Sequence, residues 1–331
     1  MEDLLIMLVR SAVILAALFT MMPYMTLFER RVISWMQVRI GPNRVGWQGL
    51  LQPLADGMKL FFKEDIRPRR ADRGLYLLAP AIALFAALLG YAVIPVGPTI
   101  EVAGKEIPLV IADMPVSLLY ILGASSLGVY ALVLGGWASG SKYSLLGSLR
   151  AAAQVVSYEL VLGLALTSVV MVAGSLRLAD IVAAQREWMW FVFVQPIGFL
   201  LYCLAACAET NRAPFDLPEA EQELVAGYHT EYSGMRFAMY FIAEYINMIT
   251  VSSLAATLFL GGWSGPFLPG PWWLLLKVMG FMFLFVWLRA TLPRLRYDQL
   301  MRLSWNTLVP LGLLNLAVTA VVIVAFGKGA T

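Results

Sequence analysis

A segment rich in carboxylates offers the clearest chemistry in this sequence. Residues 209–235 lie between two long apolar stretches, and Arg212 is the only Lys or Arg between residues 209 and 232. The acidic residues of this segment are Glu209, Asp216, Glu219, Glu221, Glu223 and Glu231. Carboxyl groups held close together titrate as a coupled set, so a change at one of them alters proton binding at the others. We therefore expect this acidic loop to be the functional centre of the chain.

Two further glutamates stand where the chain is otherwise apolar. Glu159 follows Ser157 and Tyr158 inside one apolar stretch, and Glu244 lies inside another. An acidic side chain at such a depth costs roughly 2.5–3.5 kcal/mol on insertion scales. Burial favours the neutral carboxyl, which can then exchange a proton near neutral pH. The alternative is a structural glutamate bonded to a neighbouring helix or to a loop arginine. Together with the acidic loop, these residues predict one connected proton path.

A cluster of charged residues follows the first apolar stretch. Glu29, Arg30 and Arg31 are consecutive, and Arg39 and Arg44 come shortly after them. Guanidinium groups stay charged and donate to planar oxygen acceptors such as carboxylates or quinone carbonyls. The cluster therefore predicts a binding surface for such a group. Simple anchoring at the membrane interface remains the alternative for Arg30 and Arg31.

Composition places the chain in the membrane class. Hydrophobic residues make up 60% of it and charged residues 14%, with a mean hydropathy of +0.76, whereas a soluble domain is about a quarter charged. One histidine and two cysteines are too few for an iron–sulfur cluster or a bis-histidine haem. We expect no metal site, and simple core packing for Cys203 and Cys207. Neither a nucleotide-binding motif nor a basic patch interleaved with aromatic residues is present, which excludes nucleic acid as an expected partner.

Eight stretches are long enough to cross a bilayer, for which a helix needs about 20 mostly apolar residues. They are residues 4–28, 75–95, 114–136, 152–173, 189–209, 236–260, 272–292 and 305–326. Glu2 and Asp3 precede the first, where a signal peptide would carry basic residues, so we expect a retained helix. The predicted fold is an all-α polytopic membrane protein, with residues 1–331 forming a single membrane domain. Arg10 lies close enough to a membrane surface to extend toward it, and Lys277 has no explanation from sequence.

Basic residues predict the orientation. The loop 28–74 holds ten Lys and Arg, and the other loops on its side add eight, against three on the opposite side. The eight are Lys142, Arg150, Arg212, Arg236, Arg289, Arg294, Arg296 and Arg302, and the three are Lys105, Arg177 and Arg186. Cytoplasmic loops carry the excess of Lys and Arg. We therefore expect both termini outside, and the long polar loops, including the acidic loop 209–235, on the cytoplasmic side.

The loop 28–74 also contains an amphipathic pattern over residues 47–63. Apolar residues recur there at helical spacing, namely Trp47, Leu50, Leu51, Leu54, Met58, Phe61 and Phe62. Polar residues fall on the other face. This predicts a helix lying in the membrane surface or against a partner. A passive surface anchor is the alternative.

Long motifs in this chain resemble one known family. They are LFERR at 27–31, QVRIGPNRVGWQGLLQPLADGMKLFFKED at 37–65, GWASGSKYSLLGSLR at 136–150, the acidic segment 209–232, and RLRYDQ at 294–299. In sequence and order they are similar to the H subunit of bacterial NADH:quinone oxidoreductase, or respiratory complex I. The mitochondrial counterpart is NADH dehydrogenase subunit 1.

The resemblance implies a membrane subunit without a redox centre of its own, in the bacterial cytoplasmic (inner) membrane. Quinone would be its substrate, and no cofactor would be covalently bound. FMN and the iron–sulfur clusters would belong to partner subunits. Its partners would be the peripheral-arm subunits carrying the terminal cluster and the quinone headgroup site, small membrane subunits, antiporter-like subunits and the lipid bilayer. The subunit would couple quinone reduction to proton translocation.

Carried over by motif, the family's functional residues fall at defined positions. The quinone tunnel would include Phe28, Arg30, Arg39, Trp47, Asp56, Lys59, Arg212 and Phe215. The proton path would include Glu159, Glu209, Asp216, Glu219, Glu221, Glu223, Glu231 and Glu244. Ser126 stands where some relatives carry a glutamate, which removes one step and leaves the route open.

Other functions fit parts of the pattern. The homologous membrane subunit of a membrane-bound hydrogenase, or of a ferredoxin- or F420-linked oxidoreductase, shares the fold and the acidic loop, although the motifs at 37–65 favour the quinone enzyme. A stand-alone secondary transporter would show two repeated halves, which this sequence lacks. A purely structural scaffold would not need glutamates within apolar stretches.

Overall fold

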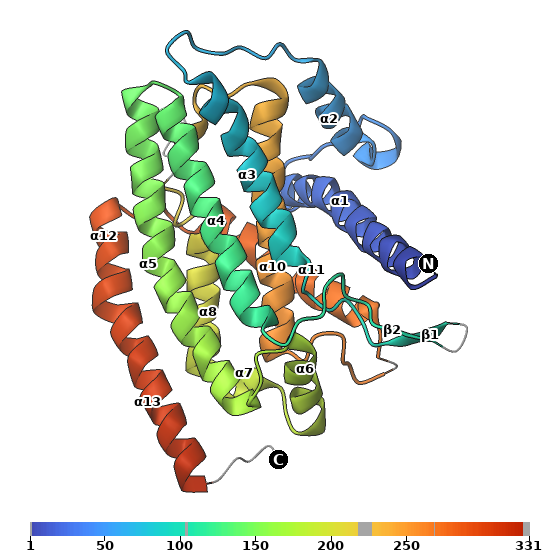
Figure 1. The fold of residues 1–331 in the computed structure, drawn as a ribbon. Coiled ribbons are helices and arrows are strands. Elements are labelled where there is room, and N and C mark those ends of the chain that lie inside the picture. Colours follow the sequence, from blue (N-terminus) through green and yellow to red (C-terminus); the bar gives the residue numbers. More distant parts are fainter. Residues whose placement is uncertain (1, 103–104, 218–226, 268, 327–331) are drawn as a thin grey trace.

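The computed structural model describes residues 2–102, 105–217, 227–267 and 269–326, which form a bundle of helices (Figure 1). Seven of the described helices are long and apolar enough to cross a membrane. This confirms the predicted all-α polytopic fold. Strands β1 (Ile100–Val102) and β2 (Lys105–Ile107) pair as a short antiparallel hairpin outside the bundle, with Ile100 opposite Ile107.

The long helices follow the apolar stretches of the sequence. They are α1 (Glu2–Met36), α3 (Arg73–Tyr91), α4 (Ser117–Ala138), α5 (Lys142–Ala173), α10 (Gly234–Phe259), α11 (Pro271–Thr291) and a final run formed by α12 (Tyr297–Arg302), the π-helical segment η3 (Leu303–Leu308) and α13 (Val309–Phe326). The shorter elements are η1 (Trp47–Gly49), α2 (Gln52–Phe62), α6 (Leu178–Glu187), α7 (Phe191–Val194), α8 (Pro196–Glu209) and η2 (Gly227–His229).

The helix α10 lies at the centre of the packing. It contacts α3 and α11, while α4 joins α3 to α5, and α5 in turn contacts α8 and α13 (Figure 1). Every residue from Met248 to Phe259 is buried, which is expected of an apolar helix surrounded by others. In contrast, α1 is inclined away from the bundle (Figure 1), and one of its faces, from Ile14 to Val32, contributes to the buried core.

The fifth predicted membrane stretch, residues 189–209, is divided in the structure. It forms the single turn α7 and the 14-residue helix α8, which begins at Pro196. Proline has no N–H and disfavours helical geometry in the residue before it. Accordingly, Gln195 has φ −126° and ψ 58° and interrupts the helix. Its buried amide bonds to Asn315 and Thr319 of α13 at 3.2 and 2.9 Å, so the break is filled with paired polar groups.

The amphipathic helix is shorter than the predicted range 47–63. Residues Trp47–Gly49 form a 3₁₀ turn in which Gln48 has a positive φ of 52°, and α2 begins only at Gln52. A left-handed residue cannot continue an α-helix, whereas proline suits a helix's first turn, and Pro53 occupies that turn. The apolar residues of α2, including Leu54, Met58 and Phe61, are exposed on the described chain.

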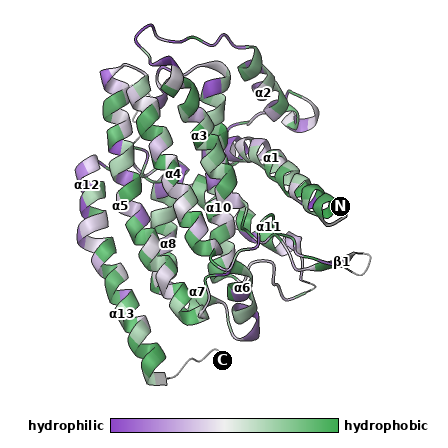
Figure 2. Cartoon of the chain, in the orientation of Figure 1, coloured by the Kyte–Doolittle hydropathy of each residue, from purple (hydrophilic) through white to green (hydrophobic). Residues whose placement is uncertain are grey.

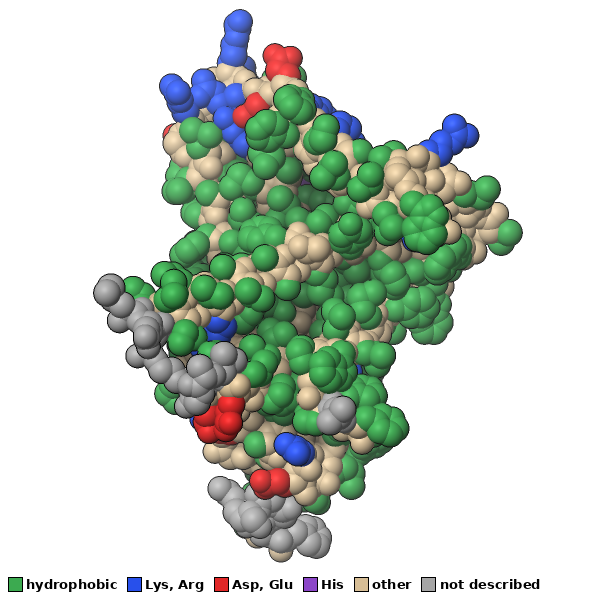
Figure 3. Space-filling view, turned by 90° about the vertical axis from the view of Figure 1, so that its right-hand side faces the viewer, with side chains coloured by type: hydrophobic (Ala, Val, Ile, Leu, Met, Phe, Trp, Pro, Cys, Tyr) green, Lys and Arg blue, Asp and Glu red, His purple; other side chains and the backbone are tan. Residues whose placement is uncertain are grey.

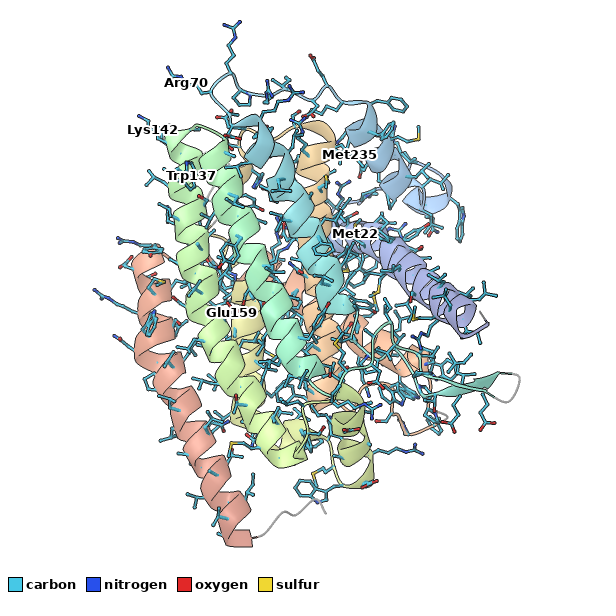
Figure 4. The ribbon with its side chains drawn as sticks, in the orientation of Figure 1. Met22, Arg70, Trp137, Lys142, Glu159 and Met235 are labelled. Carbon is cyan, nitrogen blue, oxygen red and sulfur yellow. The ribbon has the colours of Figure 1, made fainter. Side chains whose placement is uncertain are left out.

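Charge and hydropathy are segregated along the bundle. Hydrophobic residues cover the lengths of the helices, and hydrophilic residues concentrate toward helix ends (Figure 2). Lys and Arg side chains gather at the end of the molecule near α2 (Figure 3), where Arg70 and Lys142 also lie (Figure 4).

The ammonium group of Lys277, on α11, bonds to the loop that follows α10. It donates to the carbonyl oxygens of Leu260, Gly262 and Ser264 at 2.6, 2.8 and 2.6 Å.

Arg10 is held by the protein rather than only by the membrane surface. Its guanidinium donates to the carbonyl oxygens of Pro108 and Ile111 at 3.2 and 3.0 Å. The sequence could not show this contact, because it joins residues about a hundred positions apart in the chain.

Candidate functional site

A cluster of charged residues around the buried Glu29 joins three helices to the acidic loop. Glu29 of α1 is 4% exposed and forms an ion pair with Arg289 of α11. Its second oxygen accepts a hydrogen bond of 2.5 Å from the hydroxyl of Tyr245 on α10. Arg212, just after α8, lies 3.5 Å from the same carboxylate. Four segments distant in sequence therefore meet at one carboxylate.

Arg212 also pairs with a glutamate that the sequence singled out. Its Nε lies 2.7 Å from Glu244 on α10, and its guanidinium lies 4.6 Å from the centre of the Tyr245 ring. Burial acts to lower the pKa of Arg212, but Glu244, with smaller contributions from Tyr245 and Glu29, raises that pKa above its ordinary value. Arg212 is consequently a permanent buried cation between two carboxylates.

These charges form part of the wall of a cavity of about 430 Å³. Its lining also includes Arg30, Phe237, Phe241 and the single histidine, His229. Ligand pockets of roughly 300–1,000 Å³ with mostly apolar walls and a few placed polar groups are typical of small-molecule sites. The combination of aromatic rings and guanidinium donors suits a planar ring that carries oxygen acceptors.

A second, smaller cavity lies next to the first. It measures about 70 Å³ and is lined by Glu209, Ser125 and Asn247, among others. Tyr228, Tyr240 and Glu244 line both cavities and form their common wall. At about 30 Å³ per water molecule, the smaller space has room for about two waters.

Glu159 lies beyond the smaller cavity, about halfway along α5 (Figure 4). It accepts a hydrogen bond from the hydroxyl of Ser126 on α4 and is close enough to Glu209 for the two charges to repel each other. Ser126, for which the family resemblance implies a lost glutamate, therefore contacts Glu159 directly. Glu244 and Glu209 thus line the same small cavity, and Glu159 lies close to Glu209.

The structure separates the other residues predicted for the quinone tunnel. Arg30 lines the larger cavity and pairs with Asp56 of α2 at 2.7 Å, which ties α1 to the amphipathic helix. Phe28 is half-buried against the core. Arg39, Trp47 and Lys59 are exposed. Phe215 is buried but lines a different cavity, apolar and about 240 Å³, that also includes Cys203 and Cys207.

The remaining residues of the predicted proton path are less directly placed. Asp216 and Glu231 are half-buried, and the backbone carbonyl of Glu231 accepts a 2.6 Å hydrogen bond from Tyr76. Glu219, Glu221 and Glu223 lie outside the described residues.

Tyr245 and Arg289 were absent from the predicted site, and Glu29 was predicted only as part of the charged cluster after the first apolar stretch, without a role in the quinone tunnel or the proton path. A signal for Glu29 exists in the sequence. It falls at helical spacing from Met22, Met25 and Val32, all of which are buried, and a charged residue on a buried helix face requires partners. Arg289 and Tyr245 carry no comparable local signal. Within the described ranges, no group of His, Cys, Asp and Glu is suited to hold a metal ion.

The sequence matches the family described as NADH dehydrogenase over residues 9–320. It is 59% identical over 319 residues to the NADH-quinone oxidoreductase H subunit of Thermomicrobium roseum, covering 94% of both chains. It is 56% identical to the H subunit numbered 2 in Geobacter sulfurreducens, covering 94% of both chains. The H subunit numbered 1 in Geobacter metallireducens is 55% identical, with 96% of both chains covered. The chain therefore belongs to the NADH dehydrogenase family and, within it, to the H subunits of NADH-quinone oxidoreductase.

Proposed function

We propose that this subunit gives quinone access to NADH:quinone oxidoreductase from the membrane and couples quinone reduction to proton movement. The larger cavity accommodates the quinone ring on its way to the electron donor. Its aromatic residues contact the ring face, and Arg30, Arg212 and Arg289 offer donors to the carbonyl oxygens. The size and mixed lining of the cavity support this assignment. The exposed residues Arg39, Trp47 and Lys59 would contribute where the neighbouring subunits complete the tunnel.

Protons would pass between Glu244, Glu209 and Glu159. Reduction of a quinone to a quinol takes two electrons, which a partner subunit supplies, and two protons. Negative charge on the reduced ring acts on Arg212 and Glu244 through surroundings in which electrostatic interactions are stronger than in water. The carboxylates then change their proton occupancy as a coupled set. The smaller cavity supports a water-mediated step between Glu244 and Glu209, because both residues line it.

The distribution of charge supports a specific orientation. The basic end near α2 would face the bacterial cytoplasm, as positive residues do in membrane proteins, and the hydrophobic helix surfaces would contact the bilayer (Figure 2). The peripheral-arm subunits, with FMN and the iron–sulfur clusters, would bind at this end. The acidic loop and α2 are the segments available to them. Small membrane subunits and antiporter-like subunits would pack along the sides of the bundle and receive the coupled change in charge.

The single observation that carries the proposal is the position of Glu244. This carboxylate belongs to the wall of the larger cavity, pairs with the buried Arg212 and also faces the smaller cavity that contains Glu209. It is therefore the residue through which a change at a bound ring can reach the interior of the bundle.

A Glu244→Gln substitution in the assembled enzyme tests the proposal. In membrane vesicles we expect NADH:quinone reduction and the accompanying proton gradient to fall by about tenfold or more, the scale of losing a positioned proton-transfer group. Electron transfer from NADH to ferricyanide should be unchanged. Glu187→Gln, which neutralises an exposed glutamate on α6, is the matched control. Normal quinone reduction and proton pumping in Glu244→Gln would show that the proposed relay is wrong.

A further inference from the structure

A buried amide on α5 bonds to the turn that carries Arg212. The side chain of Gln154 is completely buried. Its Nε2 donates to the backbone carbonyl of Ala208 at 2.8 Å and to that of Phe215 at 2.7 Å. Asn211 Oδ1 lies 3.3 Å from the same nitrogen. One side chain therefore holds the chain both before and after Arg212.

The turn between these two carbonyls is tight and depends on this support. The N–H of Arg212 bonds to Cys207 at 3.3 Å, and its carbonyl accepts from Phe215 at 2.8 Å. Asn211 has a φ of +52°, a left-handed geometry that costs energy for residues other than glycine and is tolerated best by Asn and Asp. Such strained positions persist only when the surroundings hold them. The two hydrogen bonds from Gln154 to the backbone on either side of Asn211 stabilise this geometry.

We propose that Gln154 is the positioning residue for Arg212, fixing the turn so that the guanidinium reaches Glu29 and Glu244 together. This inference rests on the proposed role of Arg212 at the quinone cavity. An amide nitrogen has two hydrogens, and each has a backbone carbonyl as its acceptor. Leucine has a similar volume but no donor, so it leaves both buried carbonyls without this partner and releases the turn.

A second buried glutamine provides a control. Gln185 of α6 is 2% exposed, donates to the carbonyl of Thr257 at 2.9 Å and accepts from the N–H of Gly261 at 2.9 Å. It is thus a bridging amide of the same kind, at the opposite end of the bundle and outside the lining of both polar cavities. Loss of a buried amide as such should affect Gln154→Leu and Gln185→Leu equally.

The test compares these variants in the assembled enzyme in native membranes. We expect Gln154→Leu to raise the KM for quinone or lower kcat by roughly tenfold or more, since small displacements of a positioning group have effects of that size. Gln185→Leu should reduce the amount of assembled enzyme while the quinone KM stays at the wild-type value. NADH:ferricyanide activity per assembled enzyme should be normal in both. Equal kinetic effects of the two substitutions would overturn the inference.

Coupling to Arg212 makes the test specific. Arg212→Lys keeps the charge but loses the planar fork of donors. Adding Gln154→Leu to Arg212→Lys should cost little more, because residues that act through one another are non-additive. Full additivity would overturn the positioning role. Wild-type kinetics in Arg212→Lys alone would instead refute the proposed function of the cavity. If Gln154→Leu does not assemble, Gln154→Asn keeps the amide but cannot span both carbonyls. Wild-type values of both the quinone KM and kcat in Gln154→Asn would also overturn the inference.

Discussion

Replacing Arg212 with glutamine would remove the cation that lies 2.7 Å from Glu244 and 3.5 Å from Glu29. Breaking a buried ion pair by deleting one partner costs about 3–5 kcal/mol, because the remaining charge stays desolvated. Glu29 keeps its ion pair with Arg289 and its bond from Tyr245. We therefore expect the free energy of unfolding to fall by about 3 kcal/mol, the lower end of this range.

A second substitution separates stability from function. In Arg212→Gln with Glu244→Gln, both members of the pair are neutral amides, and replacing a whole buried pair with neutral groups is often close to neutral in free energy. The double variant should recover about 2 kcal/mol of the loss. It should still fail in coupled quinone reduction, since the proton-binding carboxylate and the cation are both gone.

The assay is thermal unfolding of the detergent-purified enzyme, together with NADH:quinone turnover and proton uptake in reconstituted vesicles. NADH:ferricyanide activity normalises for assembled enzyme. A stability loss well under 1 kcal/mol in Arg212→Gln would contradict the description of Arg212 as a buried counter-ion. Recovery of both stability and coupled turnover in the double variant would show that the pair is only structural.

Three further predictions concern other parts of the bundle. Glu159→Gln should lower coupled quinone reduction by about tenfold or more, while ferricyanide reduction is unchanged. Ser126→Ala should lower coupled quinone reduction by a smaller factor. Equal coupled rates in wild type and Glu159→Gln would contradict this prediction. Lys277→Met leaves three carbonyls without their donor and should destabilise the enzyme by about 3 kcal/mol in thermal unfolding, with the quinone KM unchanged. A hydrogen bond from Arg177 lowers the pKa of Asp113, so this group stabilises the fold above its unfolded pKa of about 3.9 and ceases to do so as pH falls through the folded value. Asp113→Asn should therefore cost about 0.2–1 kcal/mol at neutral pH, and this cost should disappear as pH falls through the folded pKa of Asp113; thermal unfolding of both proteins as a function of pH would measure it.

The membrane fold could be predicted because its signals are local. Runs of about 20 apolar residues mark spanning helices wherever they occur, and seven of the eight predicted stretches correspond to long helices. The division of the fifth stretch was less accessible. Pro196 disfavours helical geometry in the residue before it, but the polar partners that stabilise the break at Gln195 lie on α13, more than a hundred residues later. The start of α2 at Gln52 could not be predicted either, because no local sequence pattern indicates the positive φ of Gln48.

The candidate site was predicted only in part, for a related reason. Glu159 and Glu244 are conspicuous in sequence because a single carboxylate in an apolar stretch is costly. Glu29 follows directly on an apolar stretch and is accompanied by Arg30 and Arg31, for which anchoring at the membrane interface was the alternative explanation. Its actual partners, Arg212 and Arg289, lie 183 and 260 residues away. Tertiary packing alone brings them together, and a single sequence does not encode that proximity in any local pattern.

A hydroxyl at Ser126, in place of the glutamate that the family resemblance implies there, has a physical consequence for the proposed proton route. Ser125 lines the smaller cavity with Glu209, and the next residue, Ser126, donates to Glu159. A hydroxyl both donates and accepts, so it can join two carboxylates without adding a third negative charge. A third charge beside Glu209 and Glu159 would increase their mutual repulsion and favour protonation of all three. In the proposed route, hydroxyls on α4 leave Glu209 and Glu159 as the carboxylates of the described chain that compete for protons here, and a change at Glu244 would be transmitted to fewer groups. The proposed route would then depend on hydrogen bonding between α4 and α5 rather than on an additional acid.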